Sequence, residues 1–216
     1  MGAEPRNEAF QPAVREAVAA LVARARAAQA AYERCSQQQL DDAATAAGWA
    51  IMKPENNRRL AELAVRDTGL GNVADKFAKN HRKTLGLLRD LQRVRTVGVI
   101  AEYPERGLTE IARAVGVVAA ITPSTNPGAT PANQIINALK CGNAIILAPS
   151  PKGHSTCALL LEFIRGEFRK IGADPDLVQL LPAPVTKEDT HELMRQADLV
   201  AATGSQSNIR AAYSSG

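Results

Sequence analysis

Polar residues suited to binding a ligand gather in a short loop between apolar segments. The loop, PSTNPG, runs from Pro123 to Gly128 and directly follows the apolar, β-branched segment Val117–Thr122. Ser, Thr, Asn, Pro and Gly replace every large apolar side chain there, as is typical of a turn. Asn126 offers a side-chain amide that both donates and accepts hydrogen bonds. From these residues alone, we interpret Asn126 as the cap of the turn before Pro127.

The segments on either side of this loop predict a βαβ unit. The segment before it has the composition of a strand that is buried on both faces. A helix follows Pro131 and stops at Gly142-Asn143, and Ala144–Ala148 is a second apolar strand. The two strands of such a unit are parallel, with a right-handed crossover. Because ligands bind beyond the carboxyl ends of parallel strands, we expect the loops Thr122–Gly128 and Ala148–Gly153 to border one crevice.

A second candidate for ligand binding is the dipeptide Gly204-Ser205. It follows the apolar segment Leu199–Thr203 and opens a helix toward Tyr213. Glycine lets a phosphate approach the backbone, and the free N–H groups at a helix start favour anions. The run Gly69-Leu70-Gly71-Asn72-Val73-Ala74 also matches a dinucleotide pattern, G-x-G-x-x-A, but that motif needs a preceding strand. Because Leu60–Asp67 is helical with interspersed charges, we interpret the run as a turn between helices.

The cysteines and histidines are better interpreted as structural residues. An odd number of cysteines without CxxC spacing indicates a reduced intracellular compartment; they are Cys35, Cys141 and Cys157. Cys141 lies at a helix end and Cys157 on a helix among Ala and Leu. We therefore interpret both as small apolar side chains that pack in the protein rather than as nucleophiles. No histidine has a partner at metal-ligand spacing, so we predict no metal site; the histidines are His81, His154 and His191.

The rest of the chain predicts the elements that must hold these loops. Apolar residues at helical spacing predict helices that form a layer against the later sheet; they cover Pro12–Arg34, Gln37–Met52, a third stretch from Pro54 to Gly69, and Asn72–Arg95. A hairpin with Pro and Gly in its turn joins Val97–Tyr103 to Leu108–Val115. From the residues alone it is an ordinary edge hairpin, one face of which should meet solvent or a partner. Residues 1–11 are polar and expected to fray.

Alternating helices and strands after the hairpin predict an α/β fold with a doubly wound parallel sheet. Beyond the βαβ unit the alternation continues through Gly153–Ile171 (helix), Leu177–Leu181 (strand), Thr186–Gln196 (helix) and Leu199–Thr203 (strand). Thr186 and Asp189 are spaced to form a capping box at the start of their helix.

Bulk composition limits the classes of function. The chain has 216 residues, 45% of them apolar, and a net charge of +4 from 26 basic and 22 acidic side chains. Aromatic residues are only 4%, which argues against a stacking platform for nucleic acid. No segment is long and apolar enough to span a membrane, and charges interrupt the N-terminus where a signal peptide would be apolar. We therefore expect a cytoplasmic protein that binds neither nucleic acid nor membrane.

Several separated segments together resemble the aldehyde dehydrogenase superfamily, from about residue 12 to the end of the chain. They are GVVAAITPSTNPGATP, ALKCGNAIILAPSP, DTGLGNVADKFAKNHRKTLGLLRDL and ADLVAATGS. ITPSTNP and the Ala before Pro-Ser resemble the CoA-acylating branch, which oxidises an aldehyde to an acyl-CoA, and TPSTNPGATPAN is similar to its members that act on sulfoacetaldehyde or acetaldehyde. The resemblance implies a Rossmann-like domain that binds NAD or NADP.

The resemblance also implies a catalytic role for Asn126. In the family's Pro-x-Asn motif, the Asn amide donates a hydrogen bond to the oxyanion that forms when a cysteine attacks the aldehyde. Here the motif is one residue longer than the common form. The residues along the nicotinamide side of the crevice are implied to be Thr122, Pro123 and Ser124, and Thr125 is implied to be a further cofactor-binding residue. The alternative for these residues is a turn that ends the strand.

The resemblance places further cofactor contacts after two other strands. Ala148-Pro149-Ser150-Pro151 falls where many members have Lys-Pro-Ser-Glu, whose Lys and Glu hold the adenosine ribose. Ala148 and Pro151 cannot form those bonds, which favours neither NAD nor NADP and is compatible with a site that accepts cofactor and CoA by turns. Gly204-Ser205 matches the family's Gly-Ser under the pyrophosphate.

The implied function is the N-terminal part of an enzyme that converts an aldehyde, CoA and NAD(P)+ to acyl-CoA and NAD(P)H. Residues 1–96 are implied to be a helical layer, 97–115 an oligomerisation arm, and 116–216 the cofactor core of a homo-oligomer. Because the resemblance covers a little under half of a family member, we expect a fragment or truncated form that lacks the catalytic domain and nucleophilic cysteine and is inactive alone. The alternative is a non-catalytic module that binds a nucleotide or a partner.

Overall fold

The computed structural model describes residues 12–214, so the expectation for residues 1–11 lies outside the described part of the chain. The helices are α1 (Pro12–Tyr32), α2 (Gln37–Met52), α3 (Pro54–Thr68), α4 (Val73–Leu91), α5 (Ala129–Lys140), α6 (His154–Ile171), α7 (Lys187–Gln196) and α8 (Gln206–Tyr213). The strands are β1 (Gly98–Tyr103), β2 (Leu108–Ala112), β3 (Val117–Thr122), β4 (Ala144–Pro149), β5 (Val178–Leu180) and β6 (Leu199–Ala202). No helix between residues 12 and 214 has the length and apolar character needed to cross a membrane.

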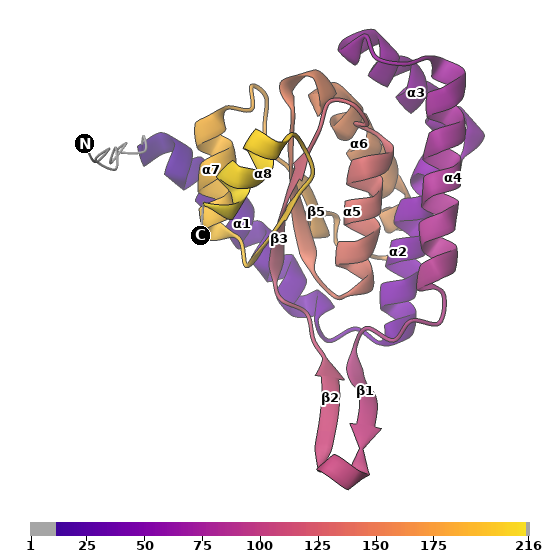
Figure 1. The fold of residues 1–216 in the computed structure, drawn as a ribbon, viewed down its shortest axis with the longest axis vertical. Helices are drawn as coiled ribbons and strands as arrows, with labels where there is room; N and C mark the ends of the chain where they lie inside the picture. The colour runs from indigo at the N-terminus through magenta and orange to yellow at the C-terminus, as the bar shows by residue number, and fades with distance from the viewer. Residues whose placement is uncertain (1–11, 215–216) are drawn as a thin grey trace.

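A parallel sheet forms the centre of the molecule (Figure 1). Within residues 12–214 it has four strands in the order β5-β4-β3-β6, and every neighbouring pair is parallel. β4 is buried along its whole length and β3 along nearly all of it, as their unbroken apolar sequences predicted. The α/β fold with a parallel sheet and helices on both faces is confirmed.

The helices cover the sheet unevenly. α5 and α6 pack on one face, while α1 and α7 pack on the other. The expectation that the first four helices form one layer against the sheet is wrong. α2 packs on the outer side of α5 and α6, and α3 and α4 pack around α2, which makes a further layer on that side (Figure 1). Helical spacing in a sequence shows which face of a helix is apolar, but it does not show which element covers that face.

Local capping agrees with the sequence at several helix ends. Thr186 and Asp189 form the predicted capping box on α7, and Gly69 ends α3 in the left-handed conformation, with φ of 67°. α4 ends at Leu91, four residues before the predicted Arg95. Gln92 leaves the helical conformation with a ψ of 129°, and Arg93 follows with a φ of 69°.

β1 and β2 form an antiparallel hairpin that projects away from the body of the molecule (Figure 1). The strand predicted up to Val115 ends at Ala112. Apolar side chains of the hairpin are exposed, which is unusual for a protein of ordinary composition; they include Val99, Ile100, Leu108 and Ile111.

Candidate functional site

The carboxyl ends of β3, β4 and β6 meet at one edge of the sheet. Thr122 lies opposite Pro149 in the β3–β4 ladder, and the Ser150 N–H donates to the Thr122 carbonyl at 3.0 Å. On the other side of β3, the Thr203 N–H donates to the Ile121 carbonyl at 3.0 Å. The loops that follow the three strands are therefore neighbours, as expected for the ligand-binding edge of a parallel sheet.

The first two loops touch each other. A Cβ on Gly153 would lie 3.0 Å from Pro127 Cβ and 3.3 Å from Ser150 Oγ. Only a residue without a side chain allows this approach. Below the contact, the Cys157 thiol donates to the Pro127 carbonyl at 3.5 Å. The loops predicted to border one crevice thus lie in direct contact with each other.

Asn126 keeps its side-chain amide free. The residue is half-buried, and its backbone carbonyl accepts from the Thr130 N–H at 3.4 Å. Its carboxamide has no hydrogen-bond partner among residues 12–214, so the amide does not cap the turn. A donor fixed on a loop and not used by the protein is available to a ligand.

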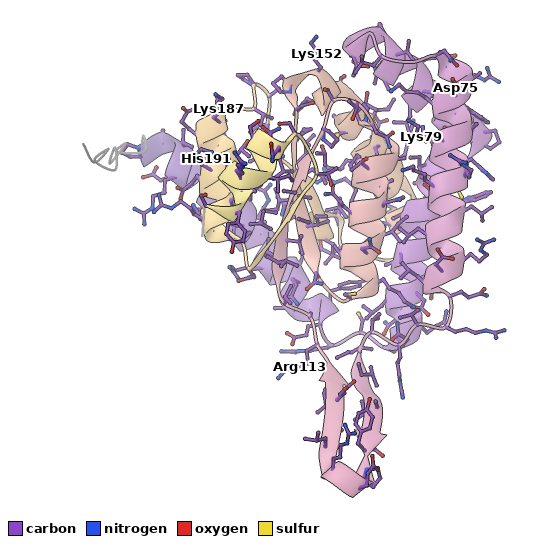
Figure 2. The ribbon with its side chains drawn as sticks, in the orientation of Figure 1. Asp75, Lys79, Arg113, Lys152, Lys187 and His191 are labelled. Carbon is purple, nitrogen blue, oxygen red and sulfur yellow. The ribbon has the colours of Figure 1, made fainter. Side chains whose placement is uncertain are left out.

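Helix α4 holds this loop from the side. The Lys76 ammonium donates to the Thr125 carbonyl at 3.0 Å, and the residue is only 5% exposed. One turn later, the Asn80 Nδ2 donates to the Asn57 Oδ1 at 3.0 Å. Burial, followed by repulsion from Lys79, lowers the pKa of Lys76. Figure 2 shows Asp75 and Lys79 on this part of α4.

The sequence analysis missed the role of α4. Its buried residues are all polar, at intervals of four: Lys76, Asn80 and Thr84. Leu85 of the same helix, by contrast, is 49% exposed. The spacing of four is a usable signal, because polar side chains that recur on one helix face point to a buried polar partner.

The segment after β4 offers one unused hydroxyl. Ala148 and Pro149 are buried, and Ser150 Oγ is buried without a hydrogen-bond partner among residues 12–214. Buried polar atoms normally have a partner, so this hydroxyl has unused capacity for a bound group. Pro151 is exposed and opens a short 3-10 helix, Pro151–Gly153.

The segment after β6 ends in an exposed helix N-terminus. Ser205 is the N-cap of α8 and accepts from the Asn208 N–H at 3.4 Å. Its hydroxyl also lies 2.8 Å from the Ser207 hydroxyl. Gly204 and Ser205 are both exposed, and a Cβ on Gly204 would lie 3.1 Å from Asn208 Nδ2. The first N–H groups of α8 face solvent, where an anion can reach them.

Two cysteines are disfavoured as nucleophiles, although the Cys157 thiol lies beside the β3 loop. Burial raises the pKa of the Cys157 thiol to about 12. Burial also raises the pKa of Cys141, against the charge of Lys140. Thiols of raised pKa are poor nucleophiles. Within residues 12–214, no three His, Cys, Asp or Glu side chains are grouped to hold a metal ion.

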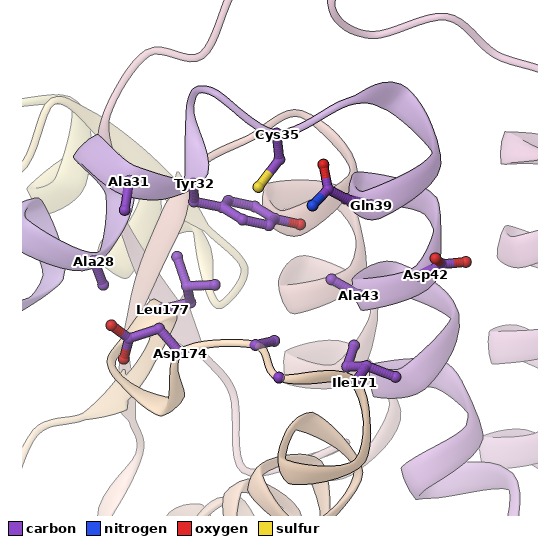
Figure 3. Close-up of a pocket in the computed structure, with 12 residues that line it drawn as sticks. Ala28, Ala31, Tyr32, Cys35, Gln39, Asp42, Ala43, Ile171, Asp174 and Leu177 are labelled. Carbon is purple, nitrogen blue, oxygen red and sulfur yellow. The ribbon is translucent and has the colours of Figure 1, made fainter.

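A separate cavity of about 230 Å³ lies between α1, α2 and the segment after α6 (Figure 3). Tyr32 and Cys35 line one wall, and Ile171 and Leu177 line another. The Tyr32 hydroxyl donates to the Leu139 carbonyl at 3.0 Å, near the C-terminal end of α5. That end of α5 precedes the amino end of β4, so the cavity is remote from the loops at the carboxyl edge.

A model of the aldehyde dehydrogenase family matches residues 8–215, which is nearly the whole chain. The chain belongs to this family. Sulfoacetaldehyde dehydrogenase (acylating) from Cupriavidus necator is 70% identical over 204 residues, which are 94% of this chain and 41% of that protein. The chain therefore spans less than half the length of this curated relative.

Solved structures of the family share the fold. An acetylating aldehyde dehydrogenase from Geobacillus thermoglucosidasius superposes with a TM-score of 0.88 at 34% identity, over 94% of this chain and 45% of that one. A Rhodopseudomonas palustris propionaldehyde dehydrogenase with bound propionyl-CoA gives a TM-score of 0.82 at 27% identity, over 92% of this chain and 44% of that one. The family resemblance in the sequence is therefore confirmed.

Proposed function

We propose that this chain supplies the cofactor-binding and oxyanion-stabilising part of a CoA-acylating aldehyde dehydrogenase. The reaction converts an aldehyde, CoA and NAD(P)+ to an acyl-CoA and NAD(P)H. The observation that carries the proposal is the unused carboxamide of Asn126, which lies on the loop after β3 at the carboxyl edge of the sheet. The 70% identity to an acylating dehydrogenase supports this branch of the family.

Asn126 has the role of an oxyanion donor in this proposal. When a thiolate adds to an aldehyde, the carbonyl oxygen becomes negatively charged, and a preoriented amide N–H stabilises that charge as it develops. The cysteines of the described chain are unsuited to supply the thiolate, because burial raises the pKa of both Cys141 and Cys157 and Cys35 lies on the wall of the remote cavity. On this proposal, the nucleophile belongs to a part of the protein outside these residues.

The residues at the carboxyl edge fit a dinucleotide. Gly204 and Ser205 would hold the pyrophosphate at the α8 N-terminus, and the orphaned Ser150 hydroxyl would bind a ribose. The β3 loop, Thr122–Thr125, would lie along the nicotinamide. The nicotinamide supplies the hydride acceptor. Because neither Ala148 nor Pro151 can bond a ribose hydroxyl or a 2′-phosphate, we propose that NAD and NADP are both accepted.

CoA is the proposed acyl acceptor, and it uses the same crevice in turn with the dinucleotide. The related Rhodopseudomonas enzyme was solved with propionyl-CoA. In Figure 2, Lys152 and Lys187 lie at the end of the molecule where the strand loops gather. Cations at this end suit a ligand that carries several phosphates.

Sulfoacetaldehyde is the proposed aldehyde, because the relative that is 70% identical is named for it.

We further propose that residues 1–96 and 116–216 form one cofactor-binding unit in the cytoplasm, and that the hairpin of residues 97–115 associates copies of a homo-oligomer.

The test measures NAD(P)H and acyl-CoA formation by the purified complete protein, with sulfoacetaldehyde in the presence and absence of CoA. We expect reduction of the dinucleotide that requires CoA and forms equimolar acyl-CoA. Reduction that proceeds equally well without CoA would contradict the acylating assignment. Binding of NAD(P)+ without any oxidation of aldehydes would support the non-catalytic nucleotide-binding module instead.

A further inference from the structure

Lys76 is a buried cation with an unusual single partner. It is 5% exposed, and within residues 12–214 the only hydrogen bond of its side chain joins Nζ to the Thr125 carbonyl at 3.0 Å. No carboxylate in this range lies within 4.0 Å of Nζ. Buried ammonium groups are normally paired with an acid. Its burial against a loop carbonyl therefore calls for an explanation beyond stability.

The bonded carbonyl belongs to the peptide that joins Thr125 to Asn126. This peptide is planar, so a donor that holds its oxygen also fixes the direction of the Asn126 N–H and the position of its Cα. The Asn126 carboxamide leaves from that Cα and has no other anchor among residues 12–214. The charge-assisted bond to the preceding carbonyl, together with the bond from the Thr130 N–H to the Asn126 carbonyl, fixes the backbone that orients the amide.

Helix α4 is itself held by hydrogen bonds to α3. Asn80, one turn after Lys76, is 3% exposed and donates to Asn57 of α3, whose Nδ2 donates to the Phe77 carbonyl at 2.9 Å. At the other end of the loop, a Cβ on Gly128 would lie only 3.1 Å from Asn80 Oδ1. Lys76 and Asn80 therefore contact the loop on both sides of Asn126.

We propose that Lys76 is a positioning residue that orients Asn126 through the Thr125 carbonyl. The proposal rests on the proposed function, because it takes Asn126 as the oxyanion donor. Lys76 does not contact the reacting atoms. It fixes the loop before the substrate arrives, so that the amide needs no reorganisation when charge develops.

The kinetic test compares Lys76→Met with Lys83→Met in the complete protein. Lys83 lies on the same helix but is exposed, so the control removes the same charge without touching the loop. We expect Lys76→Met to lower kcat by about tenfold to a hundredfold, the scale of a small misplacement of a catalytic group. KM for CoA and NAD(P)+ should stay within about twofold, and Lys83→Met should resemble the parent. A kcat loss of equal size in both variants would contradict the proposal.

A double-mutant cycle separates positioning from a general structural effect. If Lys76 acts through Asn126, the double variant Lys76→Met/Asn126→Ala should have the same kcat as Asn126→Ala alone. Losses that multiply would overturn the proposal. A rise in KM for sulfoacetaldehyde but not for acetaldehyde, with kcat unchanged, would also overturn it, because it would mean that Lys76 binds the substrate's anionic group.

Amide hydrogen exchange tests the same contact without catalysis. In Lys76→Met, amides between residues 124 and 130 that can exchange should do so faster than in the parent and in Lys83→Met. If the parent shows no CoA-dependent activity, the proposed function fails, and exchange still decides whether Lys76 anchors the loop. Unchanged exchange in Lys76→Met would refute the anchoring.

Discussion

At the scale of single residues, the carboxyl edge of the sheet holds polar groups whose bonding capacity the protein leaves unused. The Asn126 carboxamide and the Ser150 hydroxyl have no partner among residues 12–214. The Ser150 hydroxyl is also buried, and an unsatisfied buried group normally destabilises a fold by about 1–3 kcal/mol, so a ligand that completes its bond would remove that penalty. Ser36, by contrast, uses its hydroxyl in the capping box of α2.

These two serines give a paired prediction. Ser150→Ala should leave the urea midpoint unchanged or slightly raised, because the hydroxyl makes no bond in the free protein. It should weaken NAD(P)+ binding by about 1 kcal/mol, roughly fivefold, the typical worth of one hydrogen bond. Ser36→Ala should do the reverse and lower stability by about 0.5–2 kcal/mol through the lost cap, with affinity unchanged. Unfolding curves and calorimetric titrations measure both quantities. Lost stability without lost affinity in Ser150→Ala would count against a ribose contact.

At the scale of elements, the site depends on close approaches that only glycine permits. Gly128 lies against the Asn80 side chain. A Cβ on Gly128 would lie 3.1 Å from the carboxamide oxygen of Asn80 and 3.3 Å from its nitrogen. A Cβ on Gly86, in the middle of α4, would meet no neighbouring atom within 4 Å. The two glycines therefore respond differently to the same substitution.

We predict that Gly128→Ala destabilises the protein by about 1–3 kcal/mol, because the added methyl must displace Asn80 from its buried bond to Asn57. Gly86→Ala should stabilise it by about 0.5–1 kcal/mol, since alanine is the better helix former and meets no neighbour. Urea unfolding of the two variants shows directly whether each substitution raises or lowers the free energy of unfolding. A Gly128→Ala variant as stable as the parent would mean that α4 does not clamp the loop tightly.

The sequence predicted the elements better than their arrangement. The apolar runs of β3 and β4 and the turn residues between them were sufficient for the parallel unit, because a strand buried on both faces has few other compositions. The prediction that the first four helices form one layer against the sheet was wrong, because α2 packs on α5 and α6 rather than on the sheet. Burial on a helix depends on partners far away in the chain, which local periodicity does not encode.

The candidate site was predictable only in part, for a related reason. The loops after parallel strands converge by topology, so the strand order alone placed Thr122 near Ser150. Lys76 lies 49 residues before Thr125 in the chain, and no local pattern links them. The only indication in the sequence was that Lys76 and Asn80 are four residues apart on one helix. This indication is weak, because lysines on helices are usually exposed.

At the scale of the whole molecule, the hairpin stands apart from an otherwise ordinary globular body. Ile111 is 59% exposed and lies opposite Val99 in the β1–β2 ladder. Exposed apolar side chains on a projecting two-stranded hairpin are suited to association with another copy, and unpaired strand edges add to that tendency.

We therefore predict self-association through the hairpin, with dimers or larger species in light scattering. Ile111→Glu should lower the scattering mass, because a carboxylate cannot be buried in an apolar interface without a large penalty. Leu85→Glu is the matched control, as Leu85 is 49% exposed but lies on α4. A monomeric parent at high concentration would contradict the prediction. Equal effects of the two substitutions would indicate non-specific apolar contact.

The measurement that tests the account most directly is steady-state kinetics of Asn126→Ala in the complete protein, with NAD(P)+ affinity determined separately. We predict a fall in kcat of about a hundredfold to a thousandfold, about 3–4 kcal/mol, because the amide stabilises charge that exists only after thiolate attack. Affinity for NAD(P)+ should be unchanged, and Asn126→Asp, which places a negative charge beside the oxyanion, should be at least as slow. Near-normal turnover with weakened NAD(P)+ binding would contradict the account, because Asn126 would then be a cofactor or turn residue.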